Sequence, residues 1–144
     1  MMNRIGIDLA EIERIKELMD RHPTFLTKIF TENERAEFNK KGKGVYQSVA
    51  GSFCVKEAVS KALGSGFSAL YIQSGGKSWK TSPDEGFEKI ICKPCWIETL
   101  HDTCGRPYVN LKGDLKKLED SLEIQVSITH TDTTAAAVVL LTIL

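Results

Sequence analysis

Two acidic segments, far apart in the sequence, contain residue types that could bind a divalent cation and a phosphate. In the first, Asp8 follows the short apolar run Ile5-Gly6-Ile7. In the second, Glu57 and Lys61 stand four residues apart, which places both on one face of a helix. Hard cations such as Mg²⁺ prefer carboxylate oxygens, and a lysine ammonium binds phosphate oxygens. If the fold brings the two segments together, they form a candidate metal and phosphate site.

Each segment also has a purely structural explanation. A carboxylate at position 8 could complement the dipole of a following helix. Glu57 and Lys61 could form an exposed ion pair, which is worth about 0.3–0.5 kcal/mol at this spacing. The neighbours of Glu57 include Cys54, Ala58 and Ala62, which predicts that this helix is packed rather than fully solvated. The residues alone leave these explanations open.

The elements that must position these residues follow from hydrophobic periodicity and from end signals. His22-Pro23 ends the first helical pattern, Thr31 and Glu34 have the spacing of a capping box, and Gly64 stops the longest helix. The N-terminal half is therefore expected to contain a strand at 3–9 and helices at 10–21, about 31–40 and 45–63.

The C-terminal half is richer in strand signals. Glycine, serine and proline are frequent at about 70–90, which we interpret as an irregular insertion, either a hairpin or a mobile surface loop. Strands are expected at 88–99, 108–111, 124–129 and 135–143, with a short helix at 115–118. Helices that precede strands predict an α+β fold with a mainly antiparallel sheet, and the length of 144 residues predicts a single domain over 1–144.

Composition excludes several classes of function. Nineteen basic and nineteen acidic residues cancel, so no global positive field favours nucleic-acid binding. No apolar run is long enough for a signal peptide or a membrane span. Four cysteines in such a chain are most simply free thiols, which predicts a cytoplasmic location.

Three segments together resemble a known family. They are Gly6-Ile7-Asp8-Leu9, the stretch from Phe53 to Gly64 that contains Lys56-Glu57-Ala58 and Lys61-Ala62-Leu63, and Val126 to Thr131. In this order they are similar to the signature motifs of the holo-acyl-carrier-protein synthases, which are small phosphopantetheinyl transferases. The resemblance implies the compact half-size unit of that family, with N-terminal helices packed on a mainly antiparallel sheet.

The resemblance also implies a reaction and roles. The family moves the 4′-phosphopantetheine arm of coenzyme A onto a serine of apo acyl carrier protein, in support of fatty acid biosynthesis, and releases adenosine 3′,5′-bisphosphate. By motif, Asp8 and Glu57 would bind Mg²⁺, and Lys61 would hold a diphosphate oxygen and stabilise the leaving group. His130 and Arg106 would lie near the nucleotide of coenzyme A. The general base stays open.

Two further expectations concern partners. Arg14 and Arg21 fall on one face of the first helix with Leu18 between them, and they match positions that grip the carrier protein in the family; a solvated face is the alternative. Family members of this length resemble homotrimers with coenzyme A between subunits, because a half-size unit lacks the second half of the cleft.

One departure from the family pattern concerns coenzyme A affinity. Ser52 stands where close relatives often have an arginine, which removes one phosphate contact. Lys41 or Lys43, in a loop that the family also uses near coenzyme A, could compensate.

Two alternative functions belong to other classes. Cys92, Cys95, His101 and Cys104 have the residue types of a zinc site, which would suggest a zinc-stabilised module. Against this, Cys92 and Cys95 would point to opposite faces if 88–99 is a strand. The second alternative is a module that binds the carrier protein without catalysis; the presence of Asp8, Glu57 and Lys61 argues against it.

Overall fold

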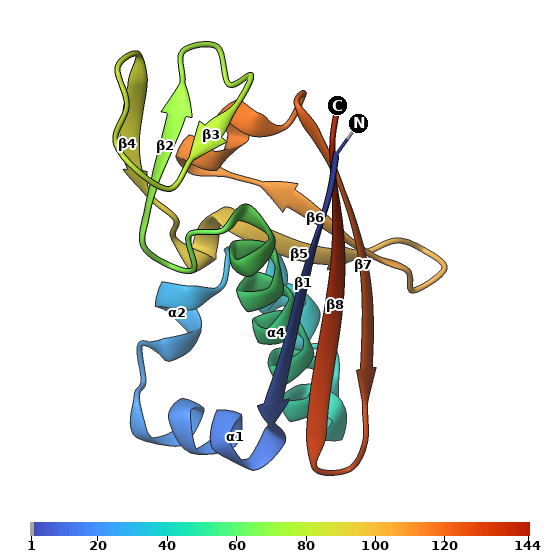
Figure 1. Ribbon diagram of the computed structural model, residues 1–144. Helices are drawn as coiled ribbons and strands as arrows, with labels where there is room; N and C mark the ends of the chain where they lie inside the picture. Colours follow the sequence, from blue (N-terminus) through green and yellow to red (C-terminus); the bar gives the residue numbers. More distant parts are fainter. Residues whose placement is uncertain (1) are drawn as a thin grey trace.

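The computed structural model describes residues 2–144, and its N-terminal half consists of one strand followed by a series of helices (Figure 1). The elements of this half are β1 (Met2–Glu11), α1 (Ile12–Arg21), α2 (Phe25–Ile29), α3 (Glu32–Phe38), the 3₁₀ turn η1 (Gly42–Gly44) and α4 (Val45–Leu63). The predicted capping box is confirmed: the Thr31 hydroxyl accepts from the Glu34 backbone N–H, and the Glu34 carboxylate accepts from that of Thr31. Gly64 ends α4 with a φ of 94°, which is why glycine is needed there.

The C-terminal half is mostly strand. Its elements are β2 (Ala69–Gln73), β3 (Trp79–Lys80), β4 (Phe87–Ile91), η2 (Pro94–Trp96), β5 (Ile97–His101), β6 (Pro107–Leu111), η3 (Gly113–Leu118), β7 (Leu122–His130) and β8 (Thr134–Ile143). All the strand pairs are antiparallel, so the predicted α+β class with an antiparallel sheet is confirmed.

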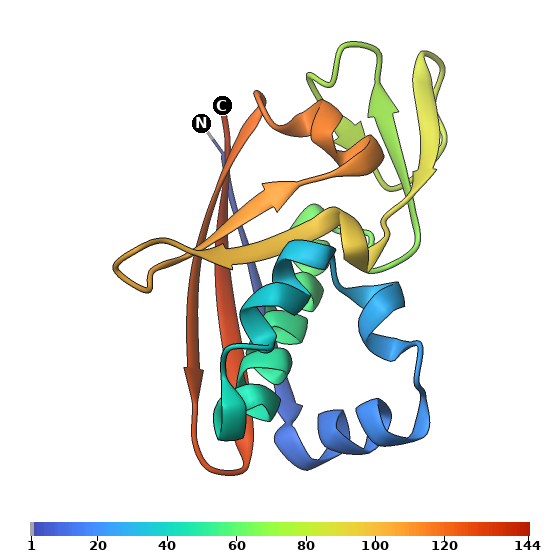
Figure 2. The same cartoon turned by 180° about the vertical axis from the view of Figure 1, so that it is seen from behind.

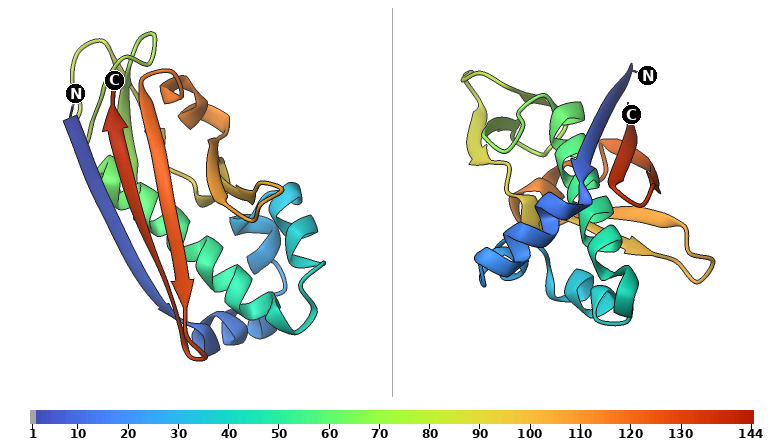
Figure 3. Two further views of the ribbon diagram at one scale, coloured as in Figure 1. Left: turned by 90° about the vertical axis from the view of Figure 1, so that its right-hand side faces the viewer. Right: turned by 90° about the horizontal axis from the view of Figure 1, so that it is seen from below.

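The main sheet has the strand order β1-β8-β7, so β1 and β7 form its two edges. The register pairs Asp8 with Ala137 and His130 with Ala135. Figure 3 shows the three long strands side by side, with α4 packed across one face of the sheet and the two termini at the same end. The view from behind shows the β5–β6 hairpin and α3 on the other side of α4 (Figure 2).

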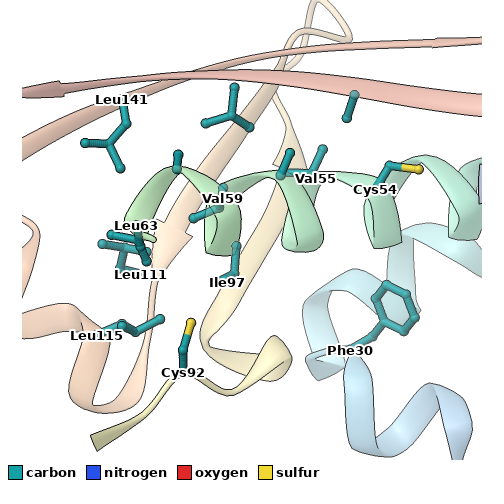
Figure 4. Packing of buried hydrophobic residues seen from close by; sticks show 14 of the residues in the cluster. Phe30, Cys54, Val55, Val59, Leu63, Cys92, Ile97, Leu111, Leu115 and Leu141 are labelled. Atoms are coloured by element: carbon teal, nitrogen blue, oxygen red, sulfur yellow. The ribbon is translucent and has the colours of Figure 1, made fainter. Parts of the chain in front are cut away.

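The core surrounds α4, which is buried on most of its circumference. Val55 and Val59 of α4 lie between Leu141 of β8 and Ile97 of β5 (Figure 4). The helix approaches β1 so closely that a Cβ on Gly6 would lie 1.8 Å from the Ala58 carbonyl oxygen. Only glycine permits this contact, so Gly6 fixes the distance between the strand of Asp8 and the helix of Glu57.

A buried ion pair fixes the other face of α4. Lys56 and Glu34 are both fully buried, and the Lys56 Nζ lies 2.7 Å from the Glu34 Oε1. The same ammonium donates to the carbonyl oxygens of Pro94 and Ile97, at 3.0 Å and 2.6 Å. All three donors are used, so Lys56 ties α4 to α3 and to the start of β5.

Two expectations for the region after α4 are wrong. Residues 70–90 are not an irregular loop but a three-stranded sheet, β3-β2-β4, in which the consecutive strands β2 and β3 form the hairpin considered as an alternative. Trp79 in this segment is 8% exposed and donates its Nε1–H to the Leu63 carbonyl. The single strand expected at 88–99 is divided into β4 and β5 by the turn at Pro94, because proline lacks the N–H that a strand needs.

Within residues 2–144, none of the helices combines the length and the apolar character that a membrane span requires.

Candidate functional site

The fold brings the two predicted acidic segments together. Gly6, Asp8 and Ala10 occupy the face of β1 that is turned toward α4, so the Asp8 carboxylate lies beside that helix. The Lys61 Nζ is 3.0 Å from the Asp8 Oδ1 and also donates to the Ile7 carbonyl at 3.0 Å. Asp8 lies inside β1 rather than at the start of a helix, which removes the helix-dipole explanation. Lys61 is not part of an isolated surface pair with Glu57, because its ammonium binds β1.

The electrostatics of Glu57 indicate a site that suits a cation. Burial is the main cause that raises the pKa of Glu57, and the neighbouring Asp8 carboxylate raises it further. The charges of Lys61 and Arg14 act in the opposite direction. Two half-buried carboxylates that repel each other gain stability from a divalent cation between them, and their oxygens are the ligands that Mg²⁺ prefers. The donor set therefore fits Mg²⁺, with other coordination positions left for a phosphate and water.

A cavity of about 420 Å³ opens beside these residues, and we call it the β1-edge pocket. Its walls include Asp8, Glu11, Arg14, Leu18, Phe53 and Glu57. Two of the three residues predicted to dock the carrier protein therefore border the same pocket as the carboxylates. The third, Arg21, is exposed at the C-terminal end of α1.

A second cavity, of about 430 Å³, lies at the opposite edge of the sheet, and we call it the β7-edge pocket. It contains two residues proposed for the nucleotide end of the site, His130 and Lys41, and also Ser52. Arg106 lies next to it, in a smaller hollow of about 300 Å³ that shares Pro107 with this pocket.

Three further polar residues line the β7-edge pocket that sequence reasoning did not assign to it: Gln47, Ser48 and His101. Gln47 and Ser48 precede Ser52 by about one helical turn, so the position of Ser52 is the one signal that could have indicated them. His101 had been considered only as a zinc ligand. Its ring Nδ1 instead lies 2.9 Å from the Glu37 Oε1.

The structure does not assemble the cysteine cluster. Cys92 is buried in the core, Cys104 is exposed in the β5–β6 turn, and all four cysteines are free thiols. Within residues 2–144, no three His, Cys, Asp or Glu side chains are close enough together to hold a metal by themselves. The zinc site proposed from Cys92, Cys95, His101 and Cys104 is therefore wrong. The division of 88–99 also removes the strand on which the argument about opposite faces depended.

Comparison with known proteins identifies the family. Residues 4–139 match the 4′-phosphopantetheinyl transferase superfamily. The chain belongs to this superfamily. The match includes both carboxylates of the site, Lys61 and strand β7, which ends in His130, and it confirms the resemblance on which the transferase prediction depended.

Individual proteins with similar sequences align with nearly the whole chain. A holo-[acyl-carrier-protein] synthase from Clostridium botulinum is 37% identical over 139 residues, which cover 95% of this chain and 94% of that protein. A second, from Caldanaerobacter subterraneus, is 38% identical and covers 93% and 90%. A crystal structure of the Bacillus anthracis synthase in complex with CoA (3′,5′-ADP) is 30% identical, with a TM-score of 0.67 and coverage of 96% and 94%. The Chronobacterium ammoniagenes ACPS-CoA complex is 27% identical, with a TM-score of 0.75 and coverage of 100% and 99%. The superfamily fold is confirmed.

Proposed function

We propose that this transferase is a Mg²⁺-dependent holo-acyl-carrier-protein synthase. It moves the 4′-phosphopantetheine group of coenzyme A onto a serine of apo acyl carrier protein, in the cytoplasm and in support of fatty acid biosynthesis. The observation that carries the proposal is the convergence of Asp8 and Glu57 at one pocket, with the Lys61 ammonium bound to Asp8, in a chain 37% identical to a named synthase. The CoA complex of the Bacillus anthracis relative supports coenzyme A as the donor.

The site residues have distinct tasks in this reaction. Asp8 and Glu57 would hold Mg²⁺, which when bound neutralises negative charge on the diphosphate of coenzyme A. Lys61 is half exposed, so its ammonium can bind a diphosphate oxygen without breaking the fold. A positive charge at this position stabilises the adenosine 3′,5′-bisphosphate leaving group as the serine oxygen attacks phosphorus. Phe53 supplies an apolar wall that limits water around the reacting groups.

The single chain divides the proposed site between two places. Asp8 and Glu57 lie at the β1 edge of the sheet, whereas the β7-edge pocket, which we assign to the nucleotide, lies at the opposite edge. A head-to-tail association of copies would bring one chain's β7 edge to the next chain's β1 edge, and such an interface closes into a ring when the rotation permits. The outer sheet face supports a buried contact, since Ile5, Ile7 and Leu9 are each at least 65% exposed. Such a ring is consistent with the homotrimer that the family resemblance implies, and we propose that assembly, with coenzyme A between subunits.

Light scattering after gel filtration tests the assembly. A mass three times that of one chain is expected, and Ile7→Glu should lower it because a buried carboxylate at the interface is costly. Ile91→Glu, at an exposed isoleucine of β4 in the β3-β2-β4 sheet and away from both edges of the main sheet, is the control. A monomeric wild-type chain that retains full turnover would contradict the shared site.

The proposed docking face is the exposed side of α1. Arg14 and Arg21 are exposed and Leu18 is half buried, a suitable surface for an acidic helix with an apolar contact. Arg21→Glu should weaken carrier-protein binding at least tenfold and leave coenzyme A affinity unchanged, since Arg21 does not border either pocket. Arg14→Glu should weaken carrier binding more than coenzyme A binding. Equal losses for both ligands would count against the docking face.

Mass spectrometry of apo acyl carrier protein, incubated with this enzyme and coenzyme A, tests the reaction. A gain of one phosphopantetheine group with Mg²⁺, and none with a chelator, is expected. Asp8→Asn and Glu57→Gln should each lower the rate by at least about a hundredfold, because each removes a charged metal ligand. Glu11→Gln, in the same pocket, is the matched control and should retain activity. Metal-independent turnover, or normal rates in the first two variants, would overturn the assignment.

A further inference from the structure

The free edge of β5 is closed by carboxylates rather than by another strand. β6 pairs with one edge of β5, and the backbone N–H groups of Thr99 and His101 point to the other. Two acids three residues apart on α3 accept these bonds: the Glu34 Oε2 from Thr99 at 3.1 Å, and the Glu37 Oε2 from His101 at 3.2 Å. The α3 carboxylates therefore hold the β5–β6 hairpin in place as a neighbouring strand would.

Glu37 makes a second bond to the same residue. Its Oε1 lies 2.9 Å from the His101 Nδ1, and because an ionised carboxylate only accepts, the Nδ1 carries the proton. Glu37 thus fixes the backbone and the ring of His101 together. The ring Nε2 has no hydrogen-bond partner among residues 2–144, and the side chain, about one third exposed, forms part of the wall of the β7-edge pocket.

The side chains that line the β7-edge pocket favour a ligand that is anionic and that also carries hydrogen-bond donors. Lys41, His101 and His130 line it, and among residues 2–144 no Asp or Glu does so. Gln47 adds an independent signal, because its buried side-chain Oε1 accepts no hydrogen bond within the described chain. A nucleotide has partners for both kinds of group: its phosphate oxygens can accept from the basic side chains, and its amino or hydroxyl groups can donate to the Gln47 Oε1.

We propose that His101, positioned by Glu37, is a specificity residue that binds the ribose 3′-phosphate of coenzyme A through its Nε2. The assignment rests on the proposed function. Coenzyme A has two anionic groups, and the diphosphate matches the carboxylates and Lys61 at the β1 edge. The 3′-phosphate remains for the β7-edge pocket, where the ring donates its Nε2–H to a phosphate oxygen in its doubly protonated form. His101 thereby supplies the cationic contact that Ser52, 3% exposed and neutral, does not.

Comparison of coenzyme A with 3′-dephospho-coenzyme A tests the specificity. His101→Asn keeps a donor near Glu37 but loses the Nε2, so kcat/KM for coenzyme A should fall about tenfold through KM, the effect of one hydrogen bond to a charged group. The value for the dephospho substrate should change less than about twofold, since it lacks the group that His101 binds. Glu37→Gln should act in the same direction but less, and His101→Lys should restore the preference. His22→Asn, outside both pockets, is the control.

Binding without turnover separates this proposal from the proposed function. Calorimetry with adenosine 3′,5′-bisphosphate and with adenosine 5′-monophosphate needs no carrier protein. If the wild type binds the bisphosphate more tightly and His101→Asn reduces that difference about tenfold, His101 has the proposed role even where no transfer is observed. Equal losses for both nucleotides would show that the residue only supports the hairpin. Unchanged affinity for the bisphosphate would also overturn the proposal.

Discussion

Replacement of Lys56 by methionine tests the idea that a buried ion pair sets the position of α4. The side chain is fully buried, and its three donors go to Glu34 and to two backbone carbonyls of the segment 94–97. Burial raises the pKa of Glu34 and lowers the pKa of Lys56, so each charge depends on its partner for compensation. Methionine preserves the length of the side chain but leaves the Glu34 charge without its cation.

The expected cost is about 3–5 kcal/mol in the free energy of unfolding, the range for removal of one partner from a buried pair. The lower half of that range is expected, because Glu34 keeps the backbone N–H groups of Thr31 and Thr99. Lys117→Met is the control: its ion pair with Glu88 spans 3.1 Å, but both side chains are more than 40% exposed. Such a pair contributes about 0–1 kcal/mol.

Urea denaturation at one fixed chain concentration provides the measurement, since subunit association would otherwise contribute to the apparent stability. The double variant Glu34→Gln with Lys56→Met should be more stable than the sum of the two single losses predicts, because it leaves no unpaired buried charge. The reasoning is refuted if Lys56→Met costs no more than Lys117→Met, or if the two losses in the double variant simply add.

Three further results are expected from single positions. Gly6→Ala should destabilise by about 1–3 kcal/mol in thermal or urea unfolding, because its Cβ would overlap a carbonyl of α4, whereas Gly44→Ala, with open space around it, should be neutral. Exposed Cys104 should react with a thiol reagent well before buried Cys54. Burial raises the pKa of the Cys54 thiol to about 12, and the Asp8 carboxylate contributes a smaller part of this shift. Equal reaction rates for the two thiols would contradict the buried position of Cys54. Trp79→Phe should cost about 1 kcal/mol through the lost Nε1 hydrogen bond, and no loss would mean that β3 does not pack on α4.

Local signals in the sequence were sufficient for the first half of the fold and for the catalytic end of the site. The periodicity from about Val45 and the stop at Gly64 predicted α4, which spans Val45–Leu63, and the capping box at Thr31 was confirmed by both of its hydrogen bonds. Asp8 and Glu57 could be paired only through motif resemblance, because spacing within each segment contains no information about the distance between them. The close approach of β1 and α4 at Gly6 is what brings them together.

Interactions between distant segments are what the sequence did not reveal. The sequence predicted only the local capping bond of Glu34. Its ion pair with Lys56 connects residues 22 positions apart and had no local signal. The glycines of 75–76 suggested irregular structure, whereas the apolar residues around them, Trp79 above all, decide that the segment packs on the core. His101 was considered for zinc because its neighbours in sequence are cysteines; its neighbour in space is Glu37. In each case tertiary contacts outweighed local composition.

One helix connects both halves of the proposed site. α4 carries Glu57 in the β1-edge pocket and Gln47 in the β7-edge pocket, so a rotation of the helix would move both together. Two contacts prevent that rotation. On the side of the sheet, Gly6 of β1 packs against the backbone of α4, and on the opposite side of the helix Lys56 forms its ion pair with Glu34 of α3. Since Glu34 and Glu37 lie one turn apart on α3, the element that fixes α4 also holds His101. The distance between the carboxylate end and the nucleotide end is therefore built into the core of each subunit, and only the contact between subunits remains to be formed on assembly.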